Sequence, residues 1–111
     1  MIYKIFRSNE WQDLQAQGDT AGAPIDLADD YIHFFTATQA QETADRHFAQ
    51  VEGLYLAAVD GAALGGDIKW EVSRGGAEFP HLYRRLQLDD VVWCLPLPLI
   101  DGRHKFPDQM T

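Results

Sequence analysis

Short apolar stretches, separated by polar and glycine-rich segments, run along the whole chain. Apolar, aromatic and β-branched residues dominate residues 2–6, 31–35, 54–59, 68–73 and 91–95, and this pattern predicts five strands. The 54–59 stretch is almost wholly apolar, so we expect it in the centre of a sheet. Residues 79–83 surround Pro80 and predict a loop or an edge segment, because proline cannot donate to a strand ladder.

Two segments predict helices, and both lie in the first half of the chain. In residues 9–17 apolar positions recur at helical spacing, Ser8 offers an N-cap and Gly18 stands at the C-cap position. A second helix begins at Thr36 or Thr38, each followed three residues later by glutamine as in a capping box, and runs to about residue 50. The intervening residues 19–30 predict a long loop, either ordered and functional or disordered. Helices segregated from strands indicate an α+β fold.

Length and composition limit the classes of protein. The chain has 111 residues, 46% of them hydrophobic, so we expect one globular domain over residues 1–111. Its net charge of −8 disfavours general nucleic-acid binding. Neither a signal peptide nor a membrane span is predicted, so we expect a cytoplasmic monomer that does not bind membranes. The single cysteine, Cys94, lies in an apolar run and predicts a buried, inert thiol.

The sequence holds no complete catalytic motif. Dinucleotide fingerprints, phosphate loops, zinc-protease motifs, paired cysteines and nucleophile elbows are all missing from it. Its histidines are far apart in sequence, so we expect no metal site.

Three polar side chains are candidates for catalysis. His33 lies within an aromatic strand, where it is either a base or donor to a ligand or a core histidine bonded to the backbone. Glu71 lies on the polar face of its strand, where it is either a base or a solvated carboxylate. His81 lies among aromatic residues, in a ligand site or a packed loop.

Four further residues are candidates for ligand binding. Phe79 and Tyr83 flank His81 and can stack on a flat base. Arg46 forms a surface pair with Glu42 four residues away or turns inward to Glu71, and residue type favours the surface pair. Thr36 is the fourth candidate, and it follows the strand that carries His33.

Four segments together resemble a small bacterial family called domain of unknown function 952. They are Ile-His-Phe-Phe-Thr at 32–36, Ala-Asp-Arg-His-Phe at 44–48, Trp-Glu at 70–71 and Phe-Pro-His-Leu-Tyr at 79–83. The resemblance covers nearly the whole chain, and it implies a fold similar to that of ADP-ribosyltransferases, a split β-sandwich shared with NAD-using transferases and RNA 2′-phosphotransferases. The motif positions of the family here are His33, Thr36, Arg46, Glu71, His81 and Tyr83.

The resemblance implies a cleft between two small sheets that holds NAD, ADP-ribose or a related nucleotide. In it His33 and His81 would contact ribose hydroxyls or phosphate, with Glu71 as base or orienter. Phe79 and Tyr83 would stack on the ligand. Relatives often carry histidine where this chain has Lys4, and a charged lysine cannot accept a hydrogen bond, which argues against the usual NAD chemistry.

Two further hypotheses remain open. In the first, the protein is a binding module that holds a metabolite or a protein without turning it over. Alternatively, the motif residues form a buried network that specifies the fold.

Overall fold

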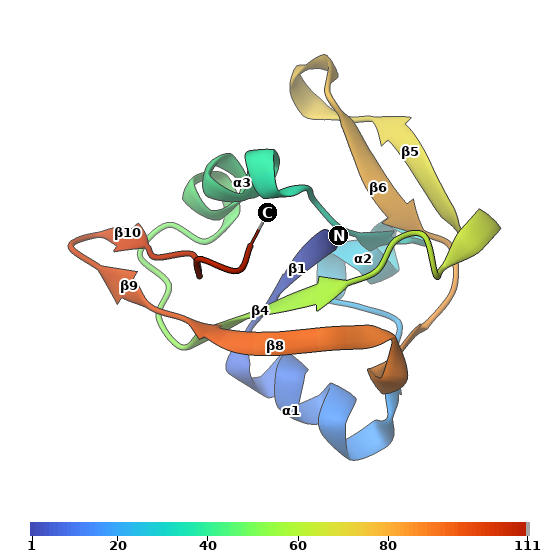
Figure 1. The fold of residues 1–111 in the computed structure, drawn as a ribbon, viewed down its shortest axis with the longest axis horizontal. Coiled ribbons are helices and arrows are strands. Elements are labelled where there is room, and N and C mark those ends of the chain that lie inside the picture. Colours follow the sequence, from blue (N-terminus) through green and yellow to red (C-terminus); the bar gives the residue numbers. More distant parts are fainter. Residues whose placement is uncertain (111) are drawn as a thin grey trace.

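Three antiparallel strands form the central sheet of the computed structural model, which describes residues 1–110 (Figure 1). These are β1 (Ile2–Phe6), β4 (Leu54–Val59) and β8 (Val91–Leu97), in the order β1-β4-β8. The prediction that residues 54–59 form a central strand is confirmed. All five residues of β1 are buried, so both faces of this sheet are covered.

A second antiparallel sheet carries most of the motif residues. Its strands are β3 (Ile32–His33), β6 (Glu78–Leu82) and β5 (Ile68–Val72), in the order β3-β6-β5. The β5–β6 hairpin projects from the body of the molecule in Figure 1. Tyr3 and Phe35 join the two sheets, because each backbone N–H donates to the other residue's carbonyl.

The prediction that residues 79–83 form a loop or an edge segment is wrong, because β6 is the central strand of its sheet. The carbonyl of Pro80 accepts from the amide of Phe34, just beyond the end of β3. A residue's nitrogen and carbonyl point toward the same neighbouring strand, so the missing N–H of Pro80 also faces this side. Proline is accommodated here because the β3 ladder has already ended.

Residues 1–110 contain three α-helices, one more than the sequence predicted. The expected helices are α1 (Ser8–Gln17) and α3 (Ala40–His47), and the additional one is α2 (Pro24–Asp29), within the predicted loop. Helix α1 begins at Ser8 itself rather than after it, and Gly18 ends it with a φ of 84°. The amide of Thr36 donates to the Gln39 side chain, as the capping-box spacing predicted.

Short elements complete the chain. One two-stranded ladder pairs β2 (Asp19–Thr20) with β7 (Leu86–Gln87), and another pairs β9 (Leu99–Ile100) with β10 (Arg103–His104). The 3-10 turns are η1 (Ala37–Gln39), η2 (Gly65–Asp67), η3 (Arg74–Gly76) and η4 (Leu88–Asp90).

The core has two parts, one on each side of the central sheet. On one side Phe6 packs with Leu14 of α1 and with Ile32 of the second sheet. On the other side Tyr3 and Ile5 pack with α3. Figure 1 shows α1 and α3 on opposite sides of β1, β4 and β8. The architecture is thus a small single-domain α+β fold. None of the helices in residues 1–110 is long and apolar enough to cross a membrane.

Candidate functional site

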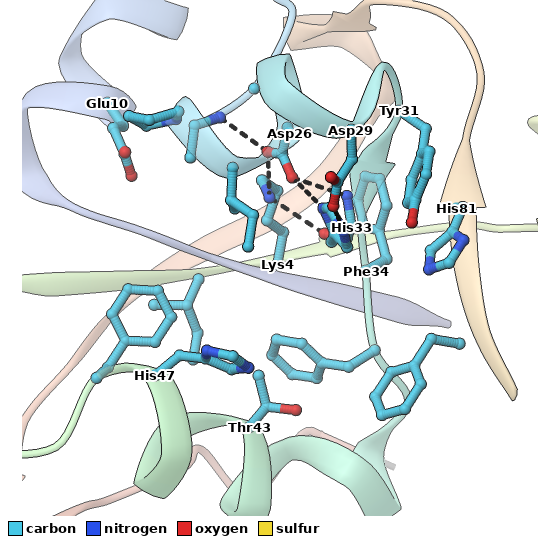
Figure 2. A pocket seen from close by; sticks show the side chains of 18 of the residues that line it. Lys4, Glu10, Asp26, Asp29, Tyr31, His33, Phe34, Thr43, His47 and His81 are labelled. Atoms are coloured by element: carbon cyan, nitrogen blue, oxygen red, sulfur yellow. Dashed lines mark hydrogen bonds and ion pairs between the residues drawn. The ribbon is translucent and has the colours of Figure 1, made fainter. Parts of the chain in front are cut away.

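A cleft of about 860 Å³ opens where β1, α2 and the second sheet face α3. Lys4, Asp26 and His33 form a polar cluster on one wall, and Thr43 and His47 of α3 lie across from it (Figure 2). Aromatic rings add an apolar wall. They are Phe34, Phe35, Phe48 and Phe79. The volume and the mixture of apolar and polar walls are typical of a small-molecule site.

Asp26 is the centre of the polar cluster, and its side chain is fully buried. One carboxylate oxygen accepts from the amide of Ala23 and from Nζ of Lys4, both at 2.8 Å. The other accepts from the amide of His33 at 3.0 Å and contacts its Nδ1 at 2.6 Å. Burial favours the neutral acid, but the hydrogen bond from His33 and the charge of Lys4 outweigh it and lower the pKa of Asp26 to about 2.

His33 contacts a carboxylate through each of its ring nitrogens. Its Nδ1 atom faces Asp26, and its Nε2 atom lies 3.1 Å from Oδ2 of Asp29. Asp29 ends α2, and its side chain is 44% exposed, so this carboxylate can leave at little cost. The fully buried Asp26 holds the His33 ring in place.

A second imidazole–carboxylate pair lies next to the first. Nδ1 of His81 lies 2.8 Å from Oε1 of Glu71, and the hydroxyl of Tyr83 donates to the same oxygen at 2.5 Å. These hydrogen bonds from Tyr83 and His81 lower the pKa of Glu71, and the bond to Glu71 raises the pKa of Tyr83 to about 12. Ionised Glu71 therefore accepts hydrogen bonds from both His81 and Tyr83.

The other ring nitrogen of His81 has no hydrogen-bond partner among the described residues. This Nε2 atom is buried, and the His81 side chain is only 3% exposed. Tyr31 stacks on the ring with a centroid distance of 4.1 Å, and it also contacts the rings of His33 and Tyr83. A buried polar atom without a partner lowers the free energy of unfolding by about 1–3 kcal/mol, and here that atom lies at the wall of the cleft.

Register explains why the candidate catalytic residues meet. His33 on β3 pairs with His81 on β6, which pairs with Lys69 on β5. Side chains two positions apart share a face of a strand, so Glu71 and Tyr83 extend the same face. The structure therefore brings together His33, Glu71, His81 and Tyr83, although the sequence spreads them over 51 positions (83 − 33 + 1).

Of the four candidate ligand-binding residues, two line the cleft and two do not. Phe79 and Arg46 line the cleft, and Arg46 pairs with Glu42 at 3.3 Å, so the predicted surface pair is confirmed. Tyr83 instead lines a smaller neighbouring pocket of about 270 Å³. The hydroxyl of Thr36 lies 3.1 Å from that of Thr38, at the start of η1.

Sequence reasoning missed Asp26 and Tyr31 as site residues. The only local signal for Asp26 is its place two residues after Pro24, because proline at the first helical position and an acidic residue in the first turn mark a helix start. The distant partners, Lys4 for Asp26 and His81 for Tyr31, come from strands that no local pattern brings near. No group of three metal-ligating side chains is found in residues 1–110.

The fold and the cleft define a small α+β protein with two carboxylate-held histidines in a small-molecule-sized cleft. The family model described as "Protein of unknown function (DUF952)" matches residues 5–94, and the chain belongs to this family. No curated protein matches the chain.

Solved structures of protein CC0527 from Caulobacter crescentus have the same fold. The crystal structure is 48% identical, covers 94% of this chain and 92% of that chain, and superimposes with a TM-score of 0.89. The solution NMR structure is 47% identical, covers 93% and 89% of the two chains, and gives a TM-score of 0.84.

Proposed function

We propose that this protein binds a nucleotide-type small molecule, of the NAD or ADP-ribose class, in the cleft between the second sheet and α3. The observation that carries this proposal is the buried Nε2 atom of His81, which has no partner in the described chain. Buried polar atoms are nearly always paired, so such an atom at a cleft wall favours a ligand that completes it.

Three features of the cleft support a nucleotide. Phe79 is partly exposed there and offers a ring on which a base can stack. Arg7 and Arg46 line the cleft and offer cations for phosphate. His33 and His81 stand side by side, where they would meet ribose hydroxyls or phosphate.

We further propose that the two three-stranded sheets correspond to the split sandwich of ADP-ribosyltransferase-like proteins. The arrangement that supports this is two separate sheets linked through the Tyr3–Phe35 bridge, with the cleft at their junction.

Binding without turnover is a second candidate function. The Oε1 atom of Glu71 already accepts from Tyr83 and His81, and these bonds lower the pKa of Glu71. A carboxylate so engaged is a weak base, and this favours an orienting role for Glu71.

Calorimetric titration of NAD and ADP-ribose tests the proposal. Wild-type protein should bind at least one of them, and His81→Ala should weaken that binding at least about tenfold, the loss of a buried hydrogen bond. His104→Ala is the matched control, because His104 is also buried but bonds to the carbonyl of Val51, outside the cleft. Equal loss in both variants, or no wild-type binding, would contradict the proposal.

A further inference from the structure

The two neighbouring imidazoles have opposite hydrogen-bonding characters. Both nitrogens of His33 face carboxylates, Asp26 through Nδ1 and Asp29 through Nε2. An ionised carboxylate only accepts hydrogen bonds, so His33 donates from both nitrogens when both bonds form. The ring is then an imidazolium, and its Nε2–H is a charged donor.

His81, in contrast, donates from one ring nitrogen and can accept at the other. Its Nδ1–H donates to Glu71, and its Nε2 atom is buried without a partner in the described chain. A second proton would place an unpaired N–H in a buried ring, which costs more than an unpaired lone pair on a neutral ring. Nε2 of His81 is therefore an acceptor, and it requires a hydroxyl or N–H group.

The donor and the acceptor belong to neighbouring rings that line one cleft. The ring centroids of His33 and His81 are 5.3 Å apart, and both residues line the cleft. Tyr31, which is only partly buried, stacks on His81 and borders both pockets. Because the Nε2 atom of His81 is buried, binding there requires the Tyr31 ring to swing aside.

Asp29 marks the place of an anionic oxygen. It contacts Nε2 of His33 at 3.1 Å, yet it is 44% exposed at the end of α2, where the helix carbonyls disfavour a negative charge. An incoming anion can replace this carboxylate without disturbing the buried Asp26.

We propose that the ligand is a phosphate monoester with a free hydroxyl beside the phosphate. A phosphate oxygen takes the place of Asp29 on Nε2 of His33, and the hydroxyl donates to Nε2 of His81. This inference rests on the proposed nucleotide-binding cleft, and it names ribose phosphate monoesters with a neighbouring hydroxyl as the ligand class in place of NAD and ADP-ribose, whose phosphates form a pyrophosphate.

Four probes distinguish the phosphate contact at His33 from the hydroxyl contact at His81 in NMR or calorimetric titrations of the full chain. Adenosine 2′-phosphate carries phosphate and an adjacent 3′-hydroxyl, and 3′-deoxyadenosine 2′-phosphate lacks only that hydroxyl. Adenosine lacks the phosphate, and inorganic phosphate lacks the nucleoside. We expect adenosine 2′-phosphate to bind about tenfold more tightly than the deoxy compound, the difference that one well-placed hydrogen bond makes, and at least as much more tightly than adenosine or inorganic phosphate, which lack larger groups.

Two variants test the residues. Asp29→Asn removes the competing charge and should tighten adenosine 2′-phosphate binding roughly threefold to fivefold, with no change for adenosine. Asp30→Asn is the matched control, because Asp30 lies in the same helix end but lines the smaller pocket, and it should change neither. His81→Phe should abolish the difference between the two nucleotide phosphates, a comparison within one variant that its stability does not affect.

The outcomes distinguish this inference from the proposed function. If NAD or ADP-ribose binds in the cleft but Asp29→Asn matches Asp30→Asn, the inference is wrong and the proposed function stands. If the deoxynucleotide phosphate binds as tightly as adenosine 2′-phosphate, the role of His81 is wrong. If no nucleotide binds at all, both fail.

Discussion

The Nδ1 atom of His33 lies 2.6 Å from Oδ1 of Asp26, seven residues earlier in the chain. This contact ties the short helix α2 to strand β3, and Lys4 adds β1 to the same carboxylate. A buried ion pair is weak evidence for stability, because desolvation offsets its attraction, but removing one partner leaves the other charge unpaired. The cluster therefore has consequences that can be measured.

Asp26→Ala should lower the free energy of unfolding by about 3–5 kcal/mol, because it leaves the Lys4 charge buried and unpaired. Glu42→Ala, which breaks the exposed pair with Arg46, should cost no more than about 0.5 kcal/mol. Urea unfolding of the two variants and the wild type measures both changes. Similar losses in the two variants would contradict the central place of Asp26.

The same carboxylate predicts a dependence of stability on pH. The pKa of Asp26 is about 2 in the folded protein and 3.8 in the unfolded chain, so folding favours the ionised form. Its contribution is complete above pH 3.8 and is lost as the pH falls through about 2. The difference in unfolding free energy between wild type and Asp26→Asn should therefore shrink by about 2 kcal/mol from pH 5 to pH 2. A constant difference would show that Asp26 is not held ionised.

Tyr83 and Glu71 predict a spectroscopic signature. The Glu71 carboxylate raises the pKa of Tyr83 to about 12, so Tyr83 should ionise late in an absorbance titration. Glu71→Gln should return this pKa toward 10.0, and Tyr83→Phe assigns the transition by removing it. A late transition that persists in Glu71→Gln would show that another group causes it.

Gly22 should tolerate no side chain. Its φ is +104°, and a Cβ atom would overlap the carboxylate of Asp26. Gly22→Ala should thus destabilise the protein by more than the roughly 1 kcal/mol of backbone strain alone. Gly18→Ala isolates that strain, because Gly18 has a φ of +84° with open space around its Cβ position. Equal losses in thermal unfolding would mean that the loop yields and the overlap is relieved.

The sequence predicted the fold where a local pattern decides it. Residues 54–59 are apolar on both faces and form the central strand, and Gly18 ends α1 in the left-handed conformation. It did not predict α2, because six residues with Ile25 and Leu27 exposed carry no apolar stripe. It also misplaced residues 79–83, because whether Pro80 fits a central strand depends on where β3 ends.

For the candidate site too, the sequence predicted what a local pattern marks and missed what only the fold brings together. Motif spacing marked His33, Glu71, His81 and Tyr83, and strand register brings them together. Asp26 was missed because its partners come from β1 and β3, and only the fold places them. The buried pair between Asp26 and Lys4 joins residues 22 positions apart (26 − 4), so no local sequence pattern predicts it.

The central claim is that the cleft around His33 and His81 binds a nucleotide. An NMR amide-shift titration of labelled protein with NAD, ADP-ribose and a 2′-phosphorylated nucleotide tests it most directly. We predict shifts clustered at His33, Glu71 and His81. No shifts at millimolar ligand, or shifts confined to other surfaces, would contradict the claim and leave the motif residues with a structural role.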